Sequence, residues 1–163
     1  MIEIEAKVKL VKDDLPRLKE QLEDDFKFIK HVKKIDFYYD VGKKISVRIR
    51  HIGNQKILTI KEKERGEGIE KNIELEWGIK SLDKLITSAG IKPKWYKEKS
   101  SEIYSGRGVS IELNEIKHLG FYLEIEATSK AKLIETFKEL GFNQKQFEKK
   151  YYLELLKNKA IYA

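Results

Sequence analysis

The chain has 163 residues, of which 40% are hydrophobic and 37% charged, and these values predict one globular domain with a substantial core. No apolar run approaches the ~20 residues that a membrane helix requires, and the absence of cysteine excludes disulfides, zinc thiolates and a cysteine nucleophile. Without cysteine or a signal-peptide pattern, the sequence predicts a cytoplasmic protein that does not contact membranes.

The balance of charge is basic, with 34 lysines and arginines against 27 aspartates and glutamates and a net charge of +7. Such a balance is typical of proteins that bind an anionic partner, whether nucleic acid, a phosphorylated metabolite or an acidic surface. A solvated lysine-rich exterior produces the same composition. Composition therefore leaves the partner open, and the positions of the charges must decide.

Alternation of apolar and charged residues predicts most of the secondary structure. The first ten residues, MIEIEAKVKL, show the period of a strand, and a leucine-rich stripe at 13–25 predicts a helix. Further strands are expected at 33–40, 43–50, 55–63, 70–77, 94–104, 107–116 and 120–127, and further helices at 81–90, 129–141 and 143–158. Glycine-containing turns between the strands predict antiparallel hairpins.

The charged residues of these strands are sorted by sign. Like charges stand two residues apart in Glu3 and Glu5, in Arg48 and Arg50, and again in later strands. Charges roughly 6.6 Å apart repel by about 0.6 kcal/mol in water and about 2.5 kcal/mol at an effective dielectric of 20. An ordinary sheet with one solvent-exposed face explains the pattern of any single strand. Repetition of the like-charge repulsion in several strands favours a functional face instead.

A sheet that closes on itself would bring these rows of charge together. We therefore expect an α+β protein built on a closed eight-stranded antiparallel β-barrel, a tunnel with flanking helices that cover its apolar exterior. An interior of cations and carboxylates is costly when empty. A polyphosphate chain with a divalent metal would satisfy both kinds of charge, since carboxylates are ligands that Mg²⁺ and Mn²⁺ take.

The motif E-x-E-x-K at Glu3, Glu5 and Lys7 resembles the signature of the CYTH superfamily, the triphosphate tunnel enzymes. The segments IDFYYD, VRIR, LTIKEK, ELEW, YKEK, LNEIKHLGFYLEIEA and KKYYLELL extend the resemblance over a single domain, residues 1–163, and it is closest to class IV adenylate cyclases. The resemblance implies a tunnel that binds triphosphates with Mg²⁺ or Mn²⁺. Family members include adenylate cyclases, thiamine triphosphatases and inorganic triphosphatases.

Carried over by position, the resemblance implies three groups of site residues. The metal ligands are Glu3, Glu5, Glu124, Glu126 and Asn114, with asparagine in place of the usual aspartate. The triphosphate ligands are Lys7, Arg48, Arg50, Lys61, Lys97, Lys99 (commonly arginine in the family) and Lys150, or its neighbour Lys149, on a helix that closes one tunnel mouth. The candidate catalytic residues are Lys7, Glu76 and Tyr38. Tyr38 is included because it shares parity with Asp36 and Asp40 rather than through the resemblance, and packing in the core or at the rim explains it better.

Three functions remain open at this level. A cyclase would convert ATP to cyclic AMP and pyrophosphate, a triphosphatase would release orthophosphate, and a sensor would bind a nucleoside or inorganic triphosphate without turnover. Binding of nucleic acid is disfavoured because paired carboxylates would repel its backbone. The sequence does not decide between a monomer and a homodimer.

Overall fold

The computed structural model describes residues 2–39, 45–66, 69–78, 88 and 90–157, and for residues 2–3, 45–46, 61–66 and 69–78 it describes the backbone alone. The strands are β1 (Ile2–Leu10), β2 (Lys27–Tyr39), β3 (Ile45–Ile52), β4 (Gln55–Gly66), β5 (Ile69–Gly78), β6 (Trp95–Gly106), β7 (Val109–Ile116) and β8 (Gly120–Ala127). The helices are α1 (Asp14–Asp25), α3 (Lys130–Glu139) and α4 (Tyr152–Lys157), with a 3₁₀ turn at Gln144–Gln146.

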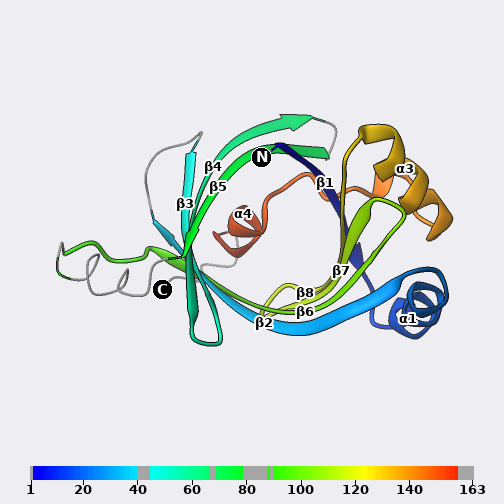
Figure 1. The fold of residues 1–163 in the computed structure, drawn as a ribbon, viewed down its shortest axis with the longest axis horizontal. Coiled ribbons are helices and arrows are strands. Elements are labelled where there is room, and N and C mark those ends of the chain that lie inside the picture. Colours follow the sequence, from blue (N-terminus) through cyan, green and yellow to red (C-terminus); the bar gives the residue numbers. More distant parts are fainter. Residues whose placement is uncertain (1, 40–44, 67–68, 79–87, 89, 158–163) are drawn as a thin grey trace.

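The strands form one antiparallel sheet in the order β1-β5-β4-β3-β2-β6-β7-β8. Because β1 pairs with β5 along one edge and with β8 along the other, the sheet closes into the ring seen in Figure 1. The predicted α+β fold with an antiparallel sheet is therefore confirmed. None of the described helices is both long and apolar enough to cross a membrane.

The main hydrophobic core lies outside the ring of strands. Apolar residues of β1, β7 and β8 pack against α1 and α3, which lie next to each other on one outer side of the barrel (Figure 1). Leu18 and Leu22 of α1 and Leu133 and Phe137 of α3 are fully buried there. Strand alternation consequently turns the opposite, polar face of the same strands inward.

Two predicted elements differ from the structure. β2 begins at Lys27 rather than at residue 33, because its first half also pairs with β6. The sequence did not predict this part of the strand, since residues 27–31 are exposed and lack apolar alternation. The single helix predicted at 143–158 is wrong. The chain instead makes a 3₁₀ turn capped by Asn143, and the Glu148 N–H donates to the Lys7 carbonyl over 2.8 Å.

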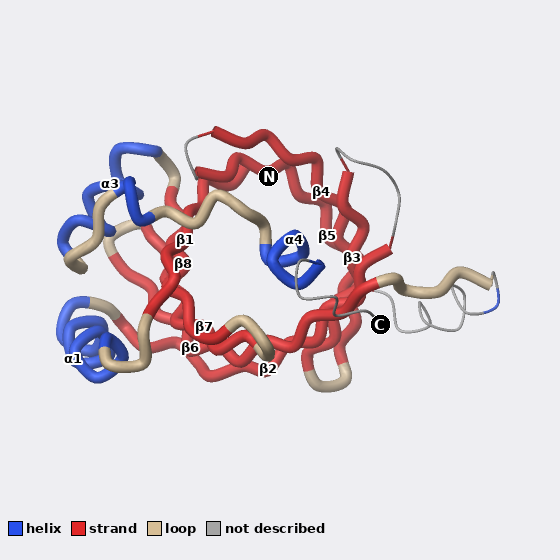
Figure 2. The backbone as a smooth tube through the Cα atoms, turned by 180° about the vertical axis from the view of Figure 1, so that it is seen from behind, coloured by secondary structure: helices blue, strands red, loops and turns tan. Residues whose placement is uncertain are grey.

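This interruption follows from the strand register. β5 pairs with β1 only as far as Ala6, so the edge of β1 beyond that point is available, and Phe147 forms a bridge with Val8 there. The short helix α4 then lies within the outline of the ring in Figure 2. Its Tyr152 and Leu156 pack against Ile116 and Tyr122. The helix predicted at 81–90 lies outside the described residues, apart from positions 88 and 90.

Candidate active site

Two neighbouring strands carry rows of buried polar residues on the inner face of the barrel. On β2 the row is Lys34, Asp36 and Tyr38, and on β6 it is Trp95, Lys97, Lys99 and Ser101. The register sets Asp36 opposite Lys97 and Lys34 opposite Lys99. Because side chains alternate along a strand, two adjacent antiparallel strands concentrate these groups into one polar wall.

The Asp36 carboxylate is the centre of the first cluster on this wall. Arg50 donates from Nε over 2.6 Å and from Nη2 over 2.9 Å, which is a bidentate pairing. Lys97 Nζ lies 3.1 Å and Arg48 Nη1 3.9 Å from the same carboxylate, and the Tyr38 hydroxyl lies 3.4 Å from it. One fully buried anion therefore holds an ammonium and two guanidinium groups in place.

Burial and charge shift the proton affinities of this Asp36 cluster. Burial acts to raise the pKa of Asp36, but Lys97 and Arg50 together hold it well below its usual value, so the group is a carboxylate. Burial lowers the pKa of Lys97 to about 8, despite the opposing attraction of Asp36. Burial also raises the pKa of Tyr38, and Asp36 raises it further. Tyr38 is therefore a neutral donor, which disfavours it as a base.

The second cluster is centred on Glu112 of β7. Its carboxylate accepts from Lys34 Nζ at 2.7 Å and from Lys99 Nζ at 2.5 Å. Lys99 also lies 3.6 Å from Glu124, so this ammonium bridges two carboxylates that face each other across β7 and β8. Burial lowers the pKa of Lys34 to about 8, whereas Glu112 and Glu124 outweigh burial and raise the pKa of Lys99.

Asn114 joins this cluster through both ends of its amide. Its Oδ1 accepts from the Ser101 hydroxyl over 2.7 Å, and its Nδ2 donates to Glu124 over 3.0 Å. The Tyr152 hydroxyl of α4 donates to the same Glu124 oxygen over 3.0 Å. Asn114 thus orients Glu124, and only the second lone pair of its carbonyl oxygen would remain for a metal.

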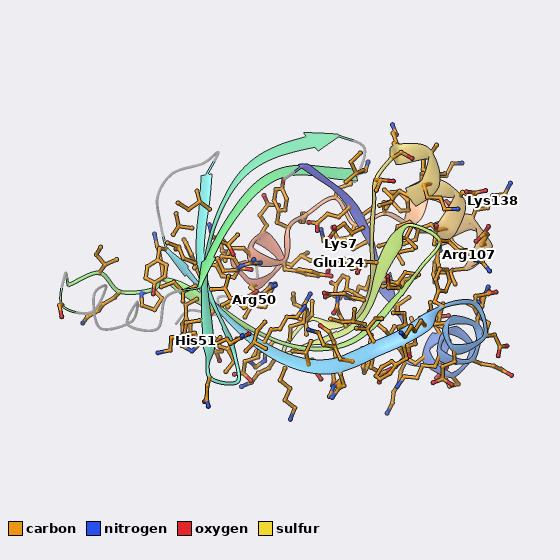
Figure 3. All side chains as sticks on the ribbon, viewed as in Figure 1. Lys7, Arg50, His51, Arg107, Glu124 and Lys138 are labelled. Atoms are coloured by element: carbon orange, nitrogen blue, oxygen red, sulfur yellow. The ribbon has the colours of Figure 1, made fainter. Side chains whose placement is uncertain are left out.

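The third part of the lining comes from β1 and β8. Lys7 is buried and faces Glu124 in register, and Glu5 faces Glu126. Figure 3 shows Lys7 and Glu124 pointing into the ring from one side and Arg50 from the other, whereas Arg107 and Lys138 lie outside it near the helices. Lys7 Nζ also lies 5.1 Å from the ring centroid of Tyr152, close enough for a cation–π contact.

The carboxylates present suit a divalent cation. Glu5 and Glu126 stand directly opposite each other on neighbouring strands, an arrangement of like charges that a cation would relieve. Within the described residues, no three carboxylate or histidine side chains converge into a complete metal site. Carboxylate oxygens are ligands that divalent cations such as Mg²⁺ commonly share with water and substrate phosphates.

The remaining predicted site residues separate into two groups. The backbone register pairs Lys61 with Glu74 and Thr59 with Glu76, but the side chains of Glu3, Lys61 and Glu76 lie outside the described part of the chain. Lys150 is described, and the expectation that it sits on the closing helix is wrong: it precedes α4 and is exposed. The extended pairing of Phe147 and Glu148 with β1 delays the start of that helix.

Three charged residues of the site were not among the predicted site residues: Lys34 and Asp36, which are buried, and Glu112, which is partly buried. Lys34, Asp36 and Tyr38 share one parity on β2, and Glu112 shares parity with Asn114 on β7. That parity was available from the sequence. A search for pairs of like charge passes over these positions, because each binds the opposite charge on a neighbouring strand.

Comparison with known proteins supports this view of the fold. The CYTH domain family matches residues 1–152. The Methanocaldococcus jannaschii protein named "Putative adenylate cyclase MJ0240" is 27% identical over 95% of this chain and 98% of its own.

Two solved structures share the architecture. A conserved hypothetical protein from Pyrococcus furiosus superimposes with a TM-score of 0.82 at 27% identity, over 94% of this chain and 99% of its own. The PH1012 protein from Pyrococcus horikoshii OT3 gives 0.82 at 26% identity, over 94% and 98%. With the family match spanning nearly the whole sequence, this chain belongs to the CYTH family.

Proposed function

We propose that this protein is a metal-dependent enzyme that acts on a triphosphate held inside the barrel in the manner of class IV adenylate cyclases, converting ATP to cyclic AMP and pyrophosphate. The observation that carries the proposal is the convergence of buried and partly buried cations from separate strands. Lys7, Arg48, Arg50, Lys97 and Lys99 all lie on the inner face beside a carboxylate pair suited to a divalent cation.

The proposed mechanism depends on positioning and neutralisation of charge. The lysines and arginines bind phosphate oxygens, and Asp36 fixes the orientation of Arg48, Arg50 and Lys97 before the substrate arrives. A divalent cation, held by Glu5, Glu124 and Glu126 with Glu3, would supply further neutralisation and lower the pKa of the attacking hydroxyl. The ribose 3′-hydroxyl loses its proton to solvent, its oxygen bonds to the α-phosphorus, the bond from the α-phosphorus to the bridging oxygen of the β-phosphate breaks, and pyrophosphate leaves.

Triphosphate hydrolysis is the second candidate. The described inner rows of β2 and β6 carry mainly charged groups, which suit a phosphate chain whatever organic group it bears. A Hippeastrum protein with this fold, 15% identical to this chain, has a structure described as revealing a dominant triphosphatase activity. If water replaced the ribose hydroxyl as the attacking group, the same lysines and arginines would be needed to bind the phosphate oxygens.

Product analysis separates the two reactions. The purified protein is incubated with ATP, thiamine triphosphate or tripolyphosphate in the presence of Mg²⁺ or Mn²⁺, and the products are identified. Cyclic AMP with pyrophosphate supports the cyclase. Orthophosphate without cyclic nucleotide rejects the cyclase in favour of the triphosphatase, and metal-dependent binding without any product indicates a triphosphate sensor.

Replacing Lys7 by alanine is expected to weaken triphosphate binding by about 10- to 100-fold, because a charge-assisted hydrogen bond contributes roughly 1.5–3 kcal/mol. The dissociation constant of tripolyphosphate measured by calorimetry tests this. Lys9→Ala is the matched control, since Lys9 lies two residues further along β1 and is exposed. If both variants change the dissociation constant equally, Lys7 does not belong to the binding site.

Triphosphate affinity is expected to fall as the pH rises above about 8. Burial lowers the pKa of both Lys97 and Lys34 to about 8, so both lose their protons in this range while the ligand remains a polyanion. Each lost proton weakens binding by up to about tenfold per pH unit. The dissociation constant of tripolyphosphate from pH 7 to 9.5 measures the slope. Lys97→Arg should make it shallower because arginine does not titrate; an unchanged slope would contradict the role of Lys97.

A further inference from the structure

Trp95 occupies an unusual position at the start of β6. It is the first member of the inner row that continues with Lys97 and Lys99, and it is 6% exposed. Its indole Nε1 is buried and has no hydrogen-bond partner in the described part of the chain. A buried N–H without a partner costs about 1–3 kcal/mol, and most such groups in folded proteins are satisfied. This donor therefore indicates a site whose acceptor comes from a ligand.

The surroundings of the indole limit what that ligand presents to it. Lys157 Nζ of α4 lies 3.8 Å from the ring centroid and Lys94 Nζ lies 4.8 Å from it, so cations cover the ring face and the N–H edge is the group left for a ligand. In register, Trp95 stands opposite Tyr38, one member of the Asp36 cluster. The donor is therefore adjacent to the cations that we assign to the triphosphate.

We propose that Trp95 recognises the organic part of a nucleoside triphosphate, its indole N–H donating one hydrogen bond to an acceptor on the base or ribose. This inference rests on the proposed function, because the triphosphate-binding cations place the rest of the molecule. A terminal phosphate would be held by the abundant ammonium and guanidinium groups. A single neutral donor at the end of the row instead suits a neutral acceptor, such as a ring nitrogen or a ribose oxygen.

Trp95→Phe tests the inference by removing the N–H while keeping an aromatic ring. The dissociation constants of ATP and tripolyphosphate are measured by calorimetry in the presence of EDTA, so that metal-dependent turnover does not compete with binding. ATP affinity should fall by about 3- to 10-fold, the value of one neutral hydrogen bond, whereas tripolyphosphate affinity should change by less than about twofold. Tyr96→Phe is the control, since the next residue points to the other face of the strand.

The outcomes separate the two proposals. If the wild-type protein binds neither ligand, with or without metal, the proposed function fails. If it binds both, and Trp95→Phe weakens them equally or leaves ATP unaffected, the role of Trp95 is overturned. A second measurement does not depend on whether Trp95→Phe folds. In the wild-type protein the indole ¹H–¹⁵N resonance of Trp95, assigned with the help of Trp77→Phe, should shift with ATP and remain in place with tripolyphosphate.

Discussion

Replacing Asp36 by asparagine is expected to lower the free energy of unfolding by about 3–5 kcal/mol, the largest effect on stability of any single change considered. The side chain is fully buried, and its negative charge neutralises Arg50 and Lys97, which are themselves 15% and 4% exposed. An amide of the same shape removes the charge and leaves these cations uncompensated. Denaturant unfolding of the ligand-free protein measures the change.

The same variant gives a second readout that a purely structural role would not produce. If the cations around Asp36 bind phosphate, tripolyphosphate should raise the melting temperature of Asp36→Asn more than that of the wild type, because the ligand replaces the missing anion. Asp25→Asn is the control: Asp25 forms an exposed pair with Arg107 over 3.0 Å, and such pairs contribute about 0–1 kcal/mol. If tripolyphosphate raises the melting temperature of Asp36→Asn no more than that of the wild type, the cations around Asp36 do not bind the substrate.

The faces of the sheet could be predicted because alternation is a local property. Once β1 is a strand, Ala6, Val8 and Leu10 share one face and Glu5 and Lys7 share the other, whatever the partners are. The outer face then requires helices to cover it, which α1 and α3 do. The position of the core followed from this reasoning.

The pairing of charges could not be predicted in the same way, because it depends on strand register. Glu112 bonds to Lys99 across the hairpin of β6 and β7, but Lys34 is 78 residues away and reaches it only because β2 lies beside β6 in the sheet. The break before α4 also depends on tertiary structure, since it follows from the exposed edge of β1 beyond Ala6. Alternation predicts which residues face inward, and register decides which of them meet.

Replacing Glu126 by glutamine is expected to reduce metal-dependent turnover by at least about 100-fold, the loss typical for removing a group that stabilises charge in the transition state. Glu126 faces Glu5 across β1 and β8, and we assign both to the metal. The folded state should not suffer, because directly opposed carboxylates are destabilising and glutamine removes one of the two charges. Initial rates over a Mg²⁺ titration test the first expectation, and thermal unfolding without metal tests the second.

The matched control is Glu115→Gln, which changes an exposed residue of the neighbouring strand β7 and should alter neither quantity. The two measurements distinguish the possible roles of Glu126. A loss of turnover with unchanged unfolding assigns it to the metal, whereas a parallel loss of stability would show that the carboxylate holds the barrel together. Normal rates with normal metal dependence would show that the Glu5–Glu126 pair does not bind the metal, because neutralising a required ligand lowers metal affinity or activity.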